Sequence, residues 1–164
     1  MIDNYLGILE ESLDRKAEVL DEIMEYNHAQ ELLLRQENVS MDELDANMEQ
    51  KDALIQKLAG LDEGFESLYE RIREQLQENK DVYREQIKRL QGLIAQVTEK
   101  SVSVQAQEAR NKKLVEDYFM AEKSQLRQGK KALKAAYGYY KSMSKSNVVE
   151  SQFVDQKIGV NYEK

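Results

Sequence analysis

The chain of 164 residues contains no cysteine, no proline and no tryptophan, and its one histidine is His28. Without cysteine there is no disulfide framework, no thiol chemistry and no cysteine zinc site. The lack of proline and the presence of only seven glycines argue against a loop-rich or all-β domain, because turns need those residues. No apolar run approaches the roughly 18 to 20 residues that span a bilayer. Acidic residues such as Asp3 and Glu10 interrupt the opening segment, so we expect no signal peptide. The composition predicts a soluble helical protein of one domain.

Acidic and basic residues are distributed unevenly along the chain. Residues 1–80 carry 21 acids and 8 bases, whereas residues 81–164 carry 10 acids and 16 bases. From Lys123 to Val149 there are seven bases and no acid. Such a run can mark nucleic-acid or membrane contact. Its spacing is loose and no aromatic stacking platform accompanies it, so we expect it to lie beside the acidic half and to bind no nucleic acid.

Apolar residues in the first part of the chain recur at steps of three or four, which is typical of an amphipathic helix. We expect this helix to cover about residues 2–37. Written as heptads, its apolar face is a coiled-coil-like seam with polar interruptions, one of which is Asn27. Asn27 either fixes the register against a partner helix or lies at a solvent-exposed end of the seam. The apolar members of the seam include Ile2, Leu6, Leu9, Leu13, Leu20, Ile23 and Leu34.

Ser40 and Glu43 have the spacing of a capping box, which predicts a second helix from about residue 41. Gly60 is a natural residue just past a helix end, so we expect this helix to stop at about residue 59. A turn at 61–64 and a third helix from about residue 63 should follow. The polar stretch 77–81 has no apolar seam residue, and we favour a break there over a solvated part of a longer helix.

The apolar stripe resumes at Val82 and extends to Tyr140, which predicts a last helix of about 59 residues, or roughly 88 Å. The first helix is shorter, at roughly 55 Å. If it pairs with residues 82–115, the seam at 114–133 should lie beyond its easy reach. We expect the first and last helices to pack antiparallel. The predicted fold class is all-α, an elongated antiparallel helical bundle or coiled coil with a long C-terminal helix.

The last part of the chain differs from the bundle in composition. We expect residues 1–141 to form the helical bundle domain and residues 142–164 to form a flexible, serine-containing tail. The tail contains a short apolar island at 153–158, which is too short for a stable isolated helix. This island either docks on its own bundle or on a partner.

The residues of an enzyme or metal site are missing from the sequence pattern. Gly60 and Gly64 match neither phosphate-binding glycine motif. Glu25 and His28 resemble half of a di-iron Glu-x-x-His motif, but that design needs a second histidine. We therefore predict a protein that is not an enzyme, with no catalytic residues, no cofactor and no metal.

Four features of the sequence together resemble one family of helical proteins. They are the acidic opening helix, a Glu-Gln-Lys stretch at 49–58 ending in Leu58, a run at 108–114 and a Tyr-Gly-Tyr-Tyr end to the last helix. In this respect the chain resembles the FlgN family of flagellar export chaperones over roughly residues 1–140. The run at 108–114 departs from the family pattern at Glu108, where the family more often has asparagine.

The resemblance implies a cytoplasmic chaperone that binds the C-terminal helical segment of hook-filament junction proteins and hands them to the flagellar type III export gate. A long helix with uncovered apolar positions can accept such a segment in a groove. The last helix is the expected client surface, and a late tyrosine of the family is implicated in contact with the gate. The expected client anchors are Leu114, Val115, Tyr118, Phe119, Leu126 and Leu133, and the candidates for gate contact are Tyr137, Tyr139 and Tyr140.

Three other functions stay open at the level of the sequence. The chain could be a structural or adaptor coiled coil that forms a homodimer through the same seam and has no client. It could use its basic run to bind nucleic acid, although the net charge of −7 argues against this. It could also be a related chaperone for flagellin or for the filament cap. No direct insertion into a membrane is expected for any of these.

Overall fold

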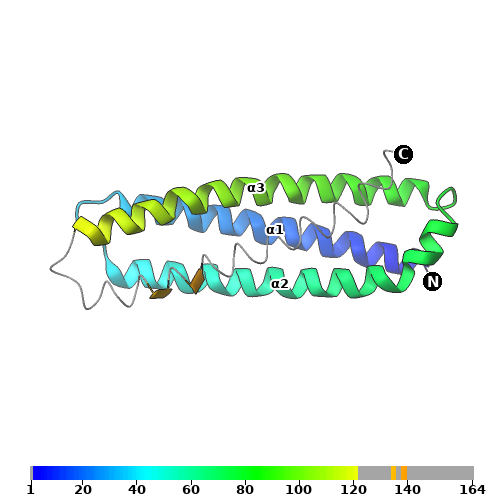
Figure 1. The fold of residues 1–164 in the computed structure, drawn as a ribbon, viewed down its shortest axis with the longest axis horizontal. Coiled ribbons are helices and arrows are strands. Elements are labelled where there is room, and N and C mark those ends of the chain that lie inside the picture. Colours follow the sequence, from blue (N-terminus) through cyan, green and yellow to red (C-terminus); the bar gives the residue numbers. More distant parts are fainter. Residues whose placement is uncertain (1, 122–133, 136–137, 140–164) are drawn as a thin grey trace.

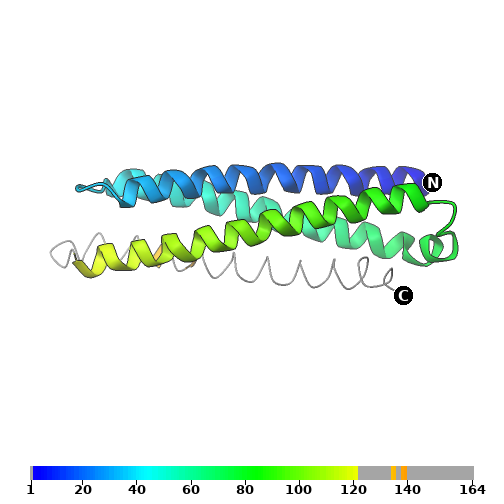
Figure 2. The same ribbon diagram turned by 90° about the horizontal axis from the view of Figure 1, so that it is seen from above.

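The computed structural model describes residues 2–121, 134–135 and 138–139 of the chain. Its three helices are α1 (Ile2–Leu34), α2 (Met41–Glu78) and α3 (Arg84–Ala121). The helices lie side by side in an elongated bundle, and within these residues there is no strand (Figures 1 and 2). At 1.5 Å per residue each of the two 38-residue helices is about 57 Å long. The predicted all-α bundle is therefore confirmed.

α1 packs against both of the other helices, and its direction relative to α3 differs from our expectation. Two ion pairs between α1 and α3, Glu10 with Arg89 and Asp21 with Lys100, advance in the same direction along both helices. α1 and α3 therefore run parallel, with α2 antiparallel to both (Figure 1). The predicted antiparallel packing of the first and last helices is wrong, because the chain reverses its direction only twice before α3.

The missing reversal is the turn that we expected at residues 61–64. α2 continues without a break through Gly60 and Gly64 to Glu78, so the prediction of a helix end at 59 is also wrong. A glycine inside a helix costs only about 1 kcal/mol relative to alanine. On either side of the glycines, Leu58 and Phe65 are buried and keep the helical spacing of the apolar face. Burial of a continuous apolar face outweighs the two glycines.

The other helix ends agree with the sequence analysis. α1 ends at Leu34, close to the expected residue 37. The side chain of Ser40 accepts a hydrogen bond from the backbone N–H of Glu43 at 3.3 Å, so the predicted cap at the start of α2 is confirmed. The break predicted at 77–81 is also confirmed, since α2 ends at Glu78 and α3 begins at Arg84. The expected end of the last helix near Tyr140 and the tail 142–164 lie outside the described residues.

The buried apolar residues form two separate clusters. The larger one, the main core, runs along the bundle from the first turns of α1 to Ile23 on α1, Ile55 on α2 and Val104 on α3. The smaller one, which we call the end cluster, lies where α1 ends, α2 begins and α3 approaches its last described turn. Its buried members are Leu34, Leu44, Met48 and Val115.

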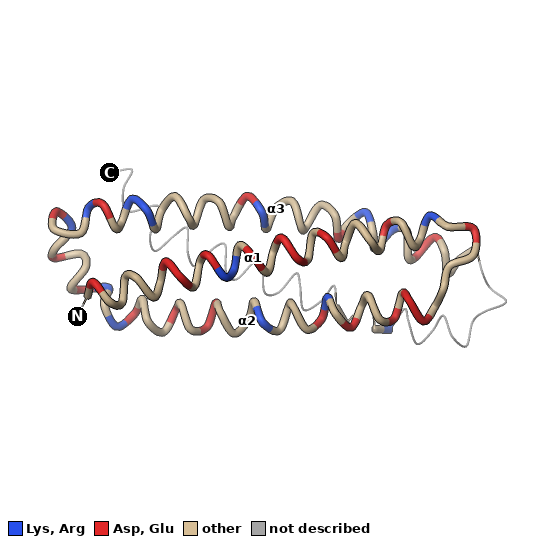
Figure 3. The backbone as a smooth tube through the Cα atoms, turned by 180° about the vertical axis from the view of Figure 1, so that it is seen from behind, with Lys and Arg blue, Asp and Glu red and all other residues tan. Residues whose placement is uncertain are grey.

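Charged residues are distributed unevenly among the three helices. Figure 3 shows that acidic residues predominate along α1 and α2, while bases are more frequent on α3. At the pairs named above, an acid of α1 meets a base of α3, as the uneven charge distribution of the sequence suggested. One partner of each pair is more than half exposed, so each pair contributes little to stability.

Candidate functional site

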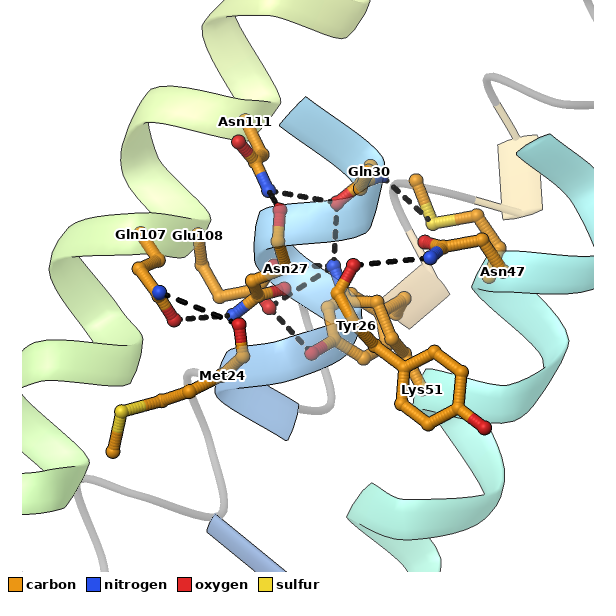
Figure 4. A network of polar contacts seen from close by, with 11 residues as sticks. Met24, Tyr26, Asn27, Gln30, Asn47, Lys51, Gln107, Glu108 and Asn111 are labelled. Atoms are coloured by element: carbon orange, nitrogen blue, oxygen red, sulfur yellow. Dashed lines mark hydrogen bonds and ion pairs between the residues drawn. The ribbon is translucent and has the colours of Figure 1, made fainter. Parts of the chain in front are cut away.

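A layer of buried polar side chains separates the main core from the end cluster. All three helices contribute to this polar layer, two residues each, at equivalent heights along the bundle (Figure 4). Burying polar groups is unfavourable unless they are hydrogen-bonded, so such a layer requires specific partners. Its members are Asn27, Gln30, Asn47, Lys51, Glu108 and Asn111.

An ion pair between Lys51 and Glu108 lies at the centre of the polar layer. The side chain of Lys51 is 0% exposed and that of Glu108 is 6% exposed, and the ammonium nitrogen lies 3.0 Å from Glu108 Oε1. Lys51 Nζ also donates hydrogen bonds to Gln30 Oε1 at 2.7 Å and to Glu108 Oε2 at 3.1 Å. Burial lowers the pKa of Lys51 from 10.5 to about 8, and the neighbouring Glu108 carboxylate opposes this shift. The lysine is thus mostly protonated at neutral pH, and the pair joins α2 to α3.

Tyr139 contacts the same ion pair from the later part of the chain. Its hydroxyl donates a hydrogen bond to Glu108 Oε1 at 2.6 Å. The ammonium group of Lys51 lies over its ring, 4.3 Å from the centroid, which is cation–π geometry. Tyr139 is only 2% exposed, whereas the neighbouring Gly138 is exposed.

Amide side chains connect the remaining members of the layer. Asn111 Nδ2 donates to the backbone oxygen of Asn27 at 2.8 Å and to Gln30 Oε1 at 3.0 Å. Asn27 Nδ2 donates to Gln107 Oε1 at 3.1 Å, and Asn47 Nδ2 donates to the backbone oxygen of Tyr26 at 3.0 Å. These bonds form only at one relative height of the three helices. Of the two alternatives for Asn27, the structure supports the one in which it fixes the register.

A second buried ion pair connects α1 to α2 within the main core. Lys16 Nζ lies 2.9 Å from Asp62 Oδ1. Burial lowers the pKa of Lys16 and raises that of Asp62 from 3.8 to about 6, and the two opposite charges oppose these shifts. The carboxylate of Asp62 therefore titrates in a range where ordinary aspartates are already ionised.

The residues predicted as client anchors fall into three groups. Val115 is buried in the end cluster, and Leu114, Tyr118 and Phe119 are half-buried and pack against it. The rings of Tyr118 and Phe119 make an edge-to-face contact with centroids 5.3 Å apart. Leu126 and Leu133 lie outside the described residues.

α1 extends further along α3 than we predicted. Leu34, the last residue of α1, is in the same cluster as Val115, so the expectation that residues from 114 onward lie beyond its reach is wrong at this position. α3 begins beside the start of α1, and the 33 residues of α1 run alongside it up to Val115.

Among the three candidates for gate contact, the structure describes Tyr139 alone, and there it is buried against Lys51 and Glu108. Tyr137 and Tyr140 lie outside the described residues. The sequence analysis did not identify Lys51, Gln30 or Glu108 as members of a site. A signal was present, since Gln30 is a polar residue on the apolar seam of the first helix.

Comparison with known proteins identifies the family of the chain. A family model described as FlgN protein matches residues 1–145, which is most of the chain. No curated protein and no solved structure matches the chain. Within the part of the chain that the structure describes, no helix is long and apolar enough to cross a membrane. The chain belongs to the FlgN family, a family of flagellar export chaperones rather than of enzymes.

Proposed function

We propose that this chain is a cytoplasmic chaperone for the hook-filament junction proteins. In this proposal it binds the C-terminal helical segment of a client, keeps the client unassembled and delivers it to the flagellar type III export gate. Membership of the FlgN family supports the chaperone role. The end cluster supports the mode of client binding.

The observation that carries the proposal is the exposure of apolar side chains around the end cluster, within the part of the chain that the structure describes. Among the described residues, four apolar side chains are buried there, and the aromatic pair Tyr118 and Phe119 is half-buried at its edge. At the same end of the bundle, Met120 on α3 is 73% exposed and Leu32 on α1 is 54% exposed. Exposed apolar groups beside half-buried aromatic rings are typical of a surface that a partner covers.

An amphipathic helix is the partner that suits this surface best. Such a helix places apolar anchors at steps of three and four residues, and it could pack along the edge of α3. A client segment that is disordered alone would fold on binding, which keeps the affinity moderate and permits release. We propose that Leu114, Tyr118 and Phe119 contact the client, while Val115 supports them from the interior.

The remaining site residues are proposed from the sequence pattern and the family resemblance. Leu126 and Leu133 continue the apolar stripe of the last helix and would extend the client surface. Tyr137 and Tyr140 are proposed to contact the export gate. Tyr139 could join them only after its side chain leaves Glu108.

A paired substitution tests the client surface. Tyr118→Ala with Phe119→Ala removes two aromatic anchors, each typically worth about 2 kcal/mol or more, so the affinity for a junction-protein C-terminal peptide should fall at least about 100-fold. Isothermal titration calorimetry would measure this affinity. The melting temperature should fall only modestly, because both rings are half-buried.

The matched control is Tyr5→Ala with Tyr83→Ala. These tyrosines are also half-buried, but they pack against the main core at the opposite end of the bundle. The control should lose a comparable amount of stability and keep its affinity for the client. Equal loss of affinity in both variants would refute the proposed surface.

Two other outcomes would favour the alternative functions. Tighter binding of flagellin or filament-cap peptides would reassign the client, and a stable homodimer that binds none of the peptides would favour the adaptor function.

A further inference from the structure

The contact of Tyr139 with the polar layer has a chemical selectivity that packing alone does not require. The tyrosine is almost fully buried, but its neighbours Lys134, Ala135 and Gly138 are exposed. Its side chain is therefore inserted into the bundle, where it also belongs to the main core. The ring and the hydroxyl group each meet a charged partner there.

Both ends of the phenol group are recognised. The hydroxyl donates to the Glu108 carboxylate at 2.6 Å, the short distance expected for a charge-assisted hydrogen bond. The face of the ring meets the Lys51 ammonium at 4.3 Å, and this attraction is stronger at a site shielded from water. Phenylalanine could provide only the second interaction, and an aliphatic side chain could provide neither.

The groups that recognise the phenol are held in place independently of it. Lys51 is oriented by Gln30 Oε1 at 2.7 Å and by Glu108. Gln30 is oriented in turn by Asn111, whose amide donates to the same Oε1 at 3.0 Å. These four residues come from α1, α2 and α3, so the arrangement is preorganised by the bundle and does not depend on Tyr139.

We propose that Gln30, Lys51 and Glu108 form a binding site for a p-hydroxyphenyl group, which Tyr139 fills in this chain. The contacts of the phenol attach the chain at position 139 to Lys51 on α2 and to Glu108 on α3. A phenol supplied by another molecule would compete with Tyr139 for the same carboxylate and the same ammonium group.

The test uses the full-length chain with Tyr139→Ala and two small probes that differ by one hydroxyl group, p-cresol and toluene. Amide chemical shifts in a two-dimensional NMR titration would report binding at Lys51 and Glu108. A charged hydrogen bond should make p-cresol bind at least about 10-fold more tightly than toluene. Tyr139→Ala combined with Glu108→Gln should lose most of this preference. The unsubstituted chain should bind neither probe at the site, because Tyr139 occupies it.

Phe65→Ala provides the matched control, since Phe65 is a buried ring of the main core. An apolar cavity should favour toluene over p-cresol, the opposite order. If the Tyr139→Ala variant binds both probes equally, or the unsubstituted chain binds p-cresol equally well, the proposal is wrong.

If Tyr139→Ala does not fold, Tyr139→Phe and Glu108→Gln are combined in a double-mutant cycle of urea midpoints. Additive midpoint shifts in that cycle would overturn the proposal, and non-additive shifts would support it.

Discussion

Replacing Lys51 with methionine should destabilise the bundle strongly, although methionine fits a similar volume. The substitution leaves the Glu108 carboxylate 6% exposed and without the cation that now lies 3.0 Å away. At an effective dielectric constant of about 20, an attraction across that distance is worth roughly 5 kcal/mol. Measured losses on breaking a buried pair are about 3–5 kcal/mol, and we expect Lys51→Met to fall in this range.

Removing both charges should restore most of the lost stability. A buried ion pair costs much desolvation, so apolar residues of similar volume often replace it with little loss. In Lys51→Met with Glu108→Leu, Gln30 Oε1 keeps its hydrogen bond from Asn111. The Tyr139 hydroxyl loses its acceptor, which costs about 1–3 kcal/mol. Adding Tyr139→Phe should therefore recover a further part of the lost free energy of unfolding.

Urea unfolding followed by circular dichroism would measure the free energy of unfolding of the two single variants, the double variant and the triple variant. We expect the double variant to be more stable than either single variant, which gives a coupling energy of several kcal/mol between positions 51 and 108. If the two single losses simply add, the pair is not coupled and the reasoning from burial fails. Should Lys51→Met fail to fold, Glu108→Gln offers a milder single variant for the same cycle.

Two further predictions concern the main core and α2. Because burial raises the pKa of Asp62 to about 6, the folded state holds a proton between pH 4 and 6 that the unfolded state has released. Raising the pH through this range should lower the free energy of unfolding by roughly 3 kcal/mol relative to that of Asp62→Asn. Urea midpoints of both proteins across this pH range would measure the change. A difference in stability that stays constant with pH would contradict the prediction. Gly60→Ala and Gly64→Ala should each raise the free energy of unfolding by about 0.5–1 kcal/mol, because both glycines are helical and the added methyl group meets open space. A lower melting temperature in either variant would show that α2 needs flexibility there.

The sequence predicted the helices better than it predicted their directions. The repeating apolar spacing, the Ser40 cap and the break near Asn79 are all local signals, and the structure confirms them. The error at Gly60 and Gly64 was also local, but it changed the topology. One helix end fewer means one chain reversal fewer, which turns an antiparallel arrangement of the first and last helices into a parallel one. The balance between a glycine and a buried apolar face depends on packing that the sequence does not display.

The polar layer could be predicted only in part for a different reason. Asn27 and Gln30 interrupt an apolar seam, so a polar contact at this height of α1 was visible in the sequence. The partners of that contact depend on the height of α3 relative to α2, and Lys51 and Glu108 are 57 residues apart in the chain. The structure pairs Glu108 with a buried lysine, so the acidic charge is balanced within the same layer.

The position of the polar layer also bears on how the two ends of the bundle depend on each other. Apolar clusters gain stability from continuous burial, whereas a hydrogen-bonded polar layer contributes chiefly register and specificity. The main core spans most of the bundle, and on the far side of the layer the described part of the chain buries four apolar residues in the end cluster. Disturbing the packing at Tyr118 and Phe119 therefore leaves the burial of Ile23, Ile55 and Val104 unchanged. A bundle divided in this way can rearrange its end around a partner helix while the rest stays folded, since regions with few buried apolar contacts open at lower free energy than the core.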